Sequence, residues 1–235
     1  MTFSIAARCA RTGRFGVAVS SSSPAVAARC AYARAGVGAA CSQNITDPRL
    51  GPRLLDLMEG GLGAADAVAA VTGAEPMIAY RQLTAIDAAG RTATYSGDGT
   101  LGVHHAAEGV DCVAAGNLLA DPGVPRAMAA AFAAVPDAEI GDRLMHALAA
   151  GLAAGGEAGP VHSAGLYVVD RVAWPVADLR VDWSEADPIA ELALLWALYK
   201  PQEAAYLDRA LNPGGAPSYG VPGDAEPDGT IPTGT

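Results

Sequence analysis

The chain has 235 residues, of which 51% are hydrophobic and 17% charged, a composition typical of a folded globular domain rather than a disordered chain. Its formal net charge of −10, with Lys200 as the single lysine, excludes the basic face that nucleic-acid binding needs. Neither a signal-peptide pattern nor an uncharged apolar run of about 18 residues is present, so we expect a cytoplasmic protein that is not membrane-bound.

The N-terminal part follows the period of strands and then changes to the period of helices. Residues 2–7 alternate, 11–14 form a turn, and 15–20 and 35–42 are further extended runs. Asp47 followed by Pro48 is typical of a helix start. Leu50, Leu54 and Met58 then lie on one helical face, which ends at a glycine pair at 60–61. A second helix is predicted over 63–71.

The rest of the chain repeats this change of period. Strands are predicted over 78–86, 92–96 and 110–115, helices over 124–135 and 140–152, and strands over 161–170 and 172–181. Asp187 and Pro188 precede a last helix that reaches Tyr199. The pattern fades from Pro201, and 212–235 is rich in proline and glycine. We therefore expect one domain over 1–200 and a disordered C-terminal tail over 201–235.

The order of the predicted elements indicates the fold class. Strands joined by tight turns are antiparallel, and paired helices cover the faces of a sheet. A doubly wound parallel sheet would need strands and helices to alternate singly, which they do not. The sequence thus predicts an α+β fold, with two stacked antiparallel sheets and a helical layer outside each one.

Several standard catalytic motifs are absent. The sequence has no GxSxG elbow, no GxGxxG after a strand, no phosphate-binding P-loop and no HExxH, so we expect neither a metal nor an organic cofactor. Its four cysteines contain no CxxC pair and are predicted to be buried reduced thiols. The adjacent pairs at 104–105 and 162–163 are interpreted as structural, since neighbouring strand residues point to opposite faces.

Thr2 is the residue that most directly suggests chemistry. Removal of Met1 is usual when the second residue is small, and it would leave a threonine with a hydroxyl nucleophile and its own α-amine. That amine has a pKa of about 7.7–8.0, so much of it is a free base at neutral pH. It can take the proton of the hydroxyl without a histidine. The alternative is that a threonine at this position is inert.

Seven stretches of the sequence resemble one bacterial family. They are 1–7, 16–19, 32–39, 44–52, 115–119, 178–182 and 187–188. Together they resemble the domain-of-unknown-function family number ten twenty-eight, with a likeness that extends over about residues 1–200. This resemblance implies an N-terminal-nucleophile (Ntn) hydrolase, a four-layer αββα sandwich, and hydrolysis of an amide-type bond in a small molecule.

The resemblance also implies where the other catalytic groups lie. Proteasome-like relatives place an acidic residue after the second strand and a lysine after the third, whereas this sequence has serines at 20–23 and Arg34 there. Ser22 is therefore the candidate partner of the amine. Backbone N–H groups where a strand meets the start of a helix are expected to hold the oxyanion, and the candidate positions are Gln43 and Asn44, before the first helix, and Asn117, at a Gly-Asn turn.

The remaining expectations concern the substrate and the alternatives. Four arginines are candidates for binding a substrate carboxylate, namely Arg34, Arg49, Arg53 and Arg180. We also expect a homodimer. A second hypothesis is a non-catalytic small-molecule-binding or assembly protein that keeps the fold. A third is a hydrolase that uses Cys9 or Cys41.

Overall fold

The structure is a computed structural model in which residues 1–221 are described. The chain divides into two compact units, Met1–Trp196 and Ala197–Thr235. The sequence predicted no regular structure after residue 200. The structure instead has a 3-10 turn at Lys200–Gln202 and helix α7 at Glu203–Leu211. The tail prediction is therefore wrong for this segment, and residues 222–235 lie outside the described part.

Within residues 1–221, ten strands form two sheets in which every neighbouring pair is antiparallel. The larger sheet has the order β10-β9-β2-β1-β8-β7. Its strands, in chain order, are β1 Thr2–Arg8, β2 Phe15–Ser21, β7 His105–Gly109, β8 Cys112–Asn117, β9 Ser163–Val169 and β10 Pro175–Val181. The N-terminal strand thus lies near the middle of this sheet.

The smaller sheet has the order β3-β4-β5-β6 and packs face to face on the larger one. Its strands are β3 Ala31–Arg34, β4 Gly38–Asn44, β5 Arg81–Asp87 and β6 Thr92–Ser96. The side chains between the sheets are small or β-branched, among them Ala6, Val17, Ala39 and Cys41, all completely buried. Small side chains allow two sheets to approach closely across a dry core.

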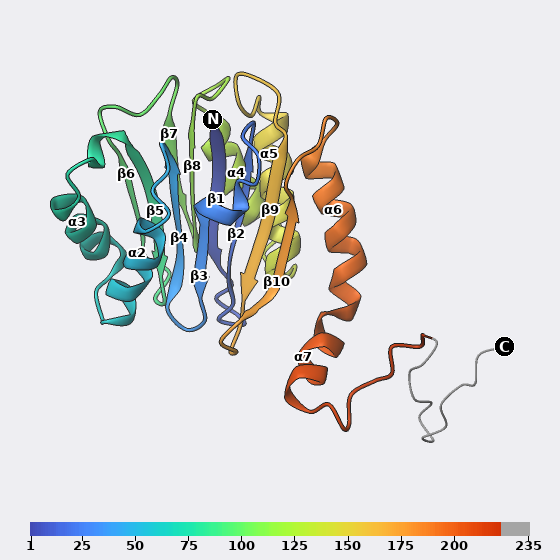
Figure 1. The fold of residues 1–235 in the computed structure, drawn as a ribbon. Helices are drawn as coiled ribbons and strands as arrows, with labels where there is room; N and C mark the ends of the chain where they lie inside the picture. Colours follow the sequence, from blue (N-terminus) through green and yellow to red (C-terminus); the bar gives the residue numbers. More distant parts are fainter. Residues whose placement is uncertain (222–235) are drawn as a thin grey trace. The chain divides into compact units, whose positions relative to one another are not determined.

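Helices cover the outer face of each sheet (Figure 1). Helices α2 (Leu50–Glu59) and α3 (Ala64–Ala74) pack on the smaller sheet, while α4 (Val124–Ala134) and α5 (Ile140–Ala153) pack on the larger one. The short α1 (Ala27–Cys30) precedes β3, and α6 (Pro188–Tyr199) follows β10. This confirms the predicted α+β class with two antiparallel sheets between helical layers.

The local differences from the sequence prediction have physical causes. The strand expected at 35–42 begins only at Gly38, because residues 35–37 form the turn between β3 and β4. Residues Ile78–Tyr80 form a 3-10 turn, so β5 begins only at Arg81. Asp47 does not cap the helix directly. Its carboxylate accepts the backbone N–H of Arg49 at 3.0 Å, and the helix begins at Leu50.

Candidate functional site

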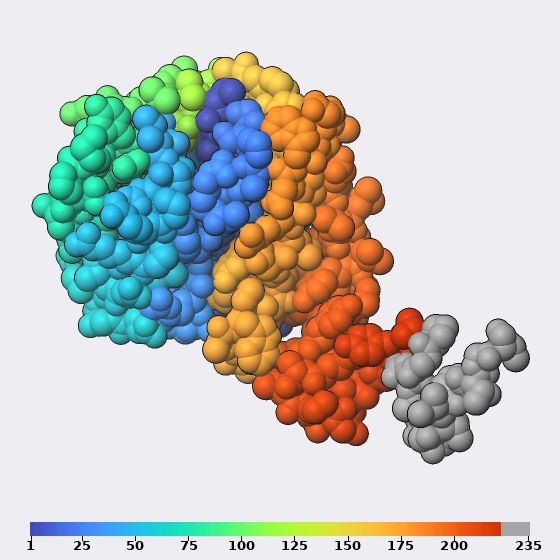
Figure 2. Space-filling model, in the orientation of Figure 1, coloured from blue at the N-terminus to red at the C-terminus, as the bar shows by residue number. Residues whose placement is uncertain are grey.

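Thr2 is the first residue of β1, and its side chain faces the second sheet. Ser4, two residues further along the same strand, donates a 2.6 Å hydrogen bond to Gln43 Oε1 on β4 of that sheet. Residues two apart in a strand point to the same side, so Thr2 points toward the space between the sheets. Its side chain is almost completely buried, although the N-terminal end of the chain reaches the surface (Figure 2).

Two hydroxyl groups converge on the peptide carbonyl that precedes Thr2. The hydroxyls of Thr2 and of Ser21, at the end of β2, both donate to the carbonyl oxygen of Met1. The two hydroxyl oxygens are 3.5 Å apart. Ser21 is buried and its oxygen also accepts the backbone N–H of Ser23 at 3.0 Å, which fixes its position. A carbonyl group beside Thr2 is therefore held by fixed donors.

A buried chain of amide side chains connects the two sheets below Thr2. Gln43 Nε2 donates to Gln82 Oε1 on β5 at 2.8 Å, and Asn117 Nδ2 on β8 donates to the same oxygen at 3.1 Å. Gln82 Nε2 donates in turn to Ser96 Oγ and to the carbonyl of Gly116, each at 3.0 Å. Paired polar groups of this kind rigidify and specify a buried site.

Asn117 ends this network with an unused acceptor. It is completely buried, and its Oδ1 has no hydrogen-bond partner among the described residues. Asn117 lies directly opposite Thr2 in the β1–β8 pair, where side chains point to the same face. A buried unpaired carbonyl is costly, so the unpaired Oδ1 of Asn117, on the strand beside Thr2, indicates a place for a donor.

Glu157 is the acidic group of this site, and the sequence analysis missed it. Its buried carboxylate accepts the backbone N–H of Ser22 at 3.1 and 3.2 Å. Burial raises the pKa of Glu157 to about 7, although the positive charge of the N-terminal amino group, this hydrogen bond and His162 all act to lower it. The carboxyl therefore changes charge near neutral pH.

Long-range structure brings Glu157 to this place. It follows Gly155 and Gly156, whose φ angles of 119° and 57° favour glycine, and it forms an isolated antiparallel bridge with Leu119. No sequence spacing links residue 157 to residue 2. The only local signal is the glycine pair after α5, which marks a sharp turn in the chain.

Histidine and serine at the start of β9 support the segment that carries Ser21 and Ser22. His162 donates its backbone N–H to the carbonyl of Ser21 at 2.9 Å, and Ser163 Oγ donates to the carbonyl of Ser23 at 2.6 Å. The ring of His162 donates from Nδ1 to the carbonyl of Ser184 at 2.8 Å and stacks on Trp183. These contacts hold the segment of Ser21 to Ser23 beside the start of β9.

Of the other candidate residues, Ser22 and Gln43 lie in the surroundings of Thr2, whereas Asn44 does not. Ser22 and Gln43 join the surroundings of Thr2, Ser22 through its backbone N–H and Gln43 through the amide network. Asn44 does not join it, because its side chain donates to the carbonyl of Tyr80 at 2.7 Å and accepts the N–H of Leu101 at 3.2 Å. Its φ of 74° shows that it serves as a turn residue.

The structure does not gather the candidate arginines around Thr2. Arg34 pairs with Asp56 and Glu59, at 2.8 and 2.5 Å, Arg49 pairs with Asp47, and Arg180 pairs with Asp178. Arg53 is exposed on α2. An arginine already held by a carboxylate is not free to bind a second one in the same bidentate way.

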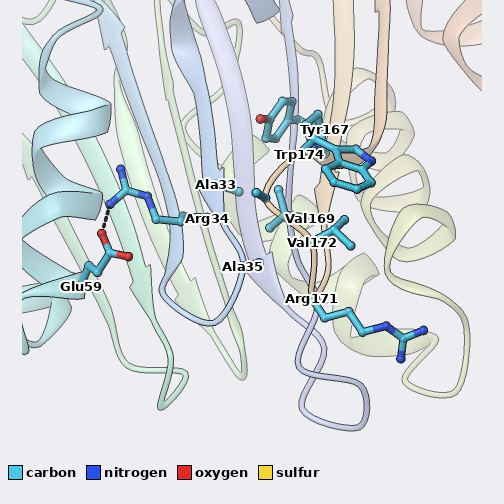
Figure 3. A pocket seen from close by; sticks show the side chains of 11 residues that line it. Ala33, Arg34, Ala35, Glu59, Tyr167, Val169, Arg171, Val172 and Trp174 are labelled. Atoms are coloured by element: carbon cyan, nitrogen blue, oxygen red, sulfur yellow. Dashed lines mark hydrogen bonds and ion pairs between the residues drawn. The ribbon is translucent and has the colours of Figure 1, made fainter. Parts of the chain in front are cut away.

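A pocket of about 440 Å³ lies at the opposite end of the larger sheet (Figure 3). Its wall includes Tyr167, Val169 and Trp174. Val169 pairs with Phe15 at one end of β2, whereas Ser163 pairs with Ser21 at the other, so about 20 Å of strand separates the pocket from Thr2. Figure 3 shows Arg34 turned toward Glu59 and Arg171 turned away from the two aromatic rings. The pocket is not part of the Thr2 site.

The described residues hold neither a cluster of metal ligands nor a membrane-spanning helix. Among residues 1–221, no three His, Cys, Asp or Glu side chains are grouped as metal ligands would be. Within the same range, no helix combines the length and apolarity needed to cross a bilayer.

The fold and the site define an α+β protein with two antiparallel sheets and a polar, buried centre at its N-terminal strand. The chain belongs to the family of unknown function DUF1028, whose family model matches residues 2–192. A crystal structure of a protein of this family, SPO2555 from Silicibacter pomeroyi, is similar to it, with 31% identity and a TM-score of 0.78 over 85% of this chain and 89% of that one. The family that the sequence resembles is thereby confirmed.

Two more distant solved structures are proteins named Anbu. The ancestral beta-subunit from Yersinia bercovieri is 10% identical with a TM-score of 0.36, over 87% of this chain and 97% of that one. Anbu from Hyphomicrobium sp. strain MC1 is 11% identical with a TM-score of 0.33, over 88% and 98% of the two chains. Likenesses this slight carry no inference about activity. The comparison with curated proteins finds no significant match.

Proposed function

We propose that this protein is an amide hydrolase of the Ntn type, in which Thr2 becomes the nucleophile once Met1 is removed. The observation that carries the proposal is the set of buried polar groups at this site: the Ser21 hydroxyl 3.5 Å from the Thr2 hydroxyl, the unpaired Oδ1 of Asn117 on the paired strand, and the Glu157 carboxyl that accepts the N–H of Ser22. Around a residue that merely begins a strand, such a set of buried polar groups would cost stability without compensation.

The proposed reaction needs no group from outside the chain except water. The α-amine of Thr2 takes the hydroxyl proton while Oγ1 adds to the substrate carbonyl, and the proton then passes to the departing nitrogen as the C–N bond breaks. Water, deprotonated by the same amine, attacks the resulting ester and releases the acid. Ser21, which donates to the Met1 carbonyl oxygen in the structure, is placed to stabilise the oxyanion.

We infer roles for the side chains of two of the candidates. The side-chain amide of Gln43 is used within the network to Ser4 and Gln82, so we assign this side chain to supporting the site. Asn117 likewise donates its amide hydrogens to Gln82 and presents only an acceptor to the site. We assign Asn117 to accepting a hydrogen bond from the Thr2 amine or from the substrate nitrogen.

The alternative of a non-catalytic binding protein is supported by the absence of a lysine beside Thr2, since the single lysine of the chain is Lys200. The alternative of a cysteine hydrolase is weaker. Cys9 and Cys41 are buried, and burial raises the pKa of Cys41 to about 11, which leaves almost no thiolate at neutral pH.

Intact mass of the purified protein tests the proposal first. A mass that lacks Met1 is expected, and a retained Met1 would exclude an N-terminal amine as the base. The processed protein is then screened against linear and cyclic amides, alongside Thr2→Ser, which keeps a hydroxyl, and Thr2→Ala, which does not. Activity in wild type and Thr2→Ser but not in Thr2→Ala is expected. Thr72→Ala, on the far side of α3, is the matched control.

A further inference from the structure

Met1 occupies a defined space beside Thr2. Its carbonyl oxygen accepts hydrogen bonds from the hydroxyls of Thr2 and Ser21. Its thioether lies along Gly159, where an added Cβ would be 3.5 Å from Met1 Cε and 4.0 Å from Sδ. The residue is half-buried. Each part of Met1 therefore has its own surroundings in the site.

The position of Met1 indicates where the acyl group of a substrate would lie in the proposed reaction. In the proposed reaction the acyl group of the substrate is carried on Thr2 Oγ1, whereas Met1 is the acyl group on the nitrogen of the same residue. The Met1 carbonyl already touches that hydroxyl. An acyl group on Oγ1 would therefore contact the same residues that now hold the Met1 carbonyl and side chain.

The charge of the site distinguishes between substrate classes. The site holds two acceptors: the Glu157 carboxylate, which accepts the N–H of Ser22 and interacts with the positive charge of the Met1 amino group, and the unpaired Oδ1 of Asn117. Arg34, Arg49 and Arg180, the candidates for a substrate carboxylate, are each paired with carboxylates of their own. Such a site favours an ammonium group over an anion.

We propose that the space filled by Met1 is the acyl subsite, and that it takes an α-aminoacyl group with an unbranched apolar side chain. This rests on the proposed function. The free amino group of the substrate lies toward Glu157, its carbonyl oxygen meets the Ser21 hydroxyl, and its side chain extends along Gly159. The substrates are then amides of apolar amino acids with a free amino group.

Binding tests this subsite separately from catalysis. The Thr2→Ala protein with Met1 removed is titrated by calorimetry with L-methioninamide, N-acetyl-L-methioninamide and glycinamide. We expect L-methioninamide to bind at least about tenfold more tightly than the N-acetylated form, because acetylation leaves the buried Glu157 without its cationic partner. Equal binding of the two amides, or no binding of either, would overturn the proposal.

Two substitutions locate the subsite. Gly159→Val places methyl groups where the thioether lies, so it is expected to weaken L-methioninamide about tenfold and glycinamide little. Gly159→Ala is a milder version that meets only ordinary van der Waals contact. Glu157→Gln is expected to remove the preference for the free amino group. Gly73→Ala, with open space around its Cβ, is the control. An equal loss for both amides in Gly159→Val would contradict the assignment.

The protein that retains Met1, expressed while methionine aminopeptidase is inhibited, completes the test. Since Met1 already fills the subsite, this form is expected not to bind L-methioninamide, and unchanged binding would overturn the proposal. Binding without turnover in the processed wild type would preserve the subsite and remove the proposed hydrolase function. Turnover of other amides without a preference for a free amino group would support the hydrolase function and overturn the proposed subsite.

Discussion

Thr2 and Asn117 lie directly opposite each other on β1 and β8. The Asn117 side chain is buried, and its Oδ1 has no hydrogen-bond partner within residues 1–221. The other end of that amide is fixed by Gln82, which Gln43 also holds. Asn117 therefore cannot turn to satisfy its oxygen without breaking the network. The unpaired acceptor is built into the pairing of the two sheets.

Asn117→Ala should lower kcat/KM for any amide substrate by roughly 10- to 100-fold, because the acceptor opposite Thr2 is lost. The stability cost should stay below about 2 kcal/mol, since the substitution also removes a buried unpaired atom. Steady-state kinetics and urea unfolding measure the two effects.

Asn44→Gly is the matched control for this substitution. Asn44 has a φ of 74°, which glycine adopts without strain, and its side chain bonds Tyr80 and Leu101 rather than the site. It should change kcat/KM less than about twofold. An equal effect of the two substitutions would show that Asn117 acts only through stability.

Glu157→Gln should remove part of the pH dependence of the free energy of unfolding. Burial raises the pKa of this carboxyl from 4.5 to about 7, so the native state binds the proton more tightly than the unfolded state. Wild-type stability should therefore fall by roughly 1–3 kcal/mol as the pH rises from about 4.5 to about 7, and then level off. The glutamine variant lacks this fall and should be the more stable protein at pH 8.

Urea unfolding at pH 5 and pH 8 measures this difference. The exposed Glu108→Gln serves as the control and should show the same slope as wild type. If Glu157→Gln and wild type lost stability in parallel between these pH values, the carboxyl would not be neutral in the native site.

The sequence predicted the elements whose pattern is local. The helical spacing of Leu144 and Leu148 in α5 and the extended run that became β9 carry their own signals, and so does the antiparallel order of the strands. These features follow from side-chain periods within ten or fifteen residues. They are also the features that fix Thr2 at the start of a central strand.

The environment of Thr2 was not predictable in the same way. Glu157 reaches it only because two glycines turn the chain after α5 and Leu119 pairs with Glu157. Asn44 and Asn117 look alike in the sequence, since each stands at the end of an extended run, before a loop. Their difference arises from which sheet edge each one meets, which depends on contacts between residues far apart in the chain.

The cysteines should be unreactive in the folded protein. All four are buried and free, and burial raises the pKa of both Cys41 and Cys112 to about 11. Burial also acts to raise the pKa of Cys9, but hydrogen bonds with Thr12 and Arg11 lower it overall, so Cys9 is protected by being only 2% exposed. We expect a thiol reagent to modify none of the four within minutes at pH 7.5 and all four in guanidinium. Rapid native modification of Cys9 or Cys41 together with loss of activity would instead support the cysteine hydrolase.

Gly51→Ala should strongly destabilise the protein, whereas Gly73→Ala should not. An added Cβ at Gly51 would lie 2.0 Å from the ring of Tyr32, where α2 packs on β3, so the helix or the ring would have to move. We expect a loss of about 2–4 kcal/mol. At Gly73, on α3, the Cβ meets nothing, and the better helix propensity of alanine should add about 0.5–1 kcal/mol. Thermal unfolding compares the two directly.

Asp87 should be a main source of acid sensitivity. Its buried carboxylate accepts the N–H groups of Ala64, at the start of α3, and of Ala89 and Arg91, and also pairs with the Arg91 side chain at 2.8 Å. Burial acts to raise the pKa of Asp87, but these hydrogen bonds outweigh it and hold the pKa below its usual value of 3.8.

The stability from Asp87 should therefore be complete above about pH 4 and disappear as the pH falls through the lowered native pKa. Asp87→Asn should lose about 1.5–3 kcal/mol at pH 7, because one amide oxygen replaces a charged acceptor of four bonds. This loss should shrink below pH 3, where the wild-type carboxyl is itself protonated. Urea unfolding at pH 7 and pH 3 measures both values, with the exposed Asp98→Asn as a control that should stay within about 0.5 kcal/mol of wild type. A loss that did not depend on pH would mean that Asp87 acts through its shape rather than its charge.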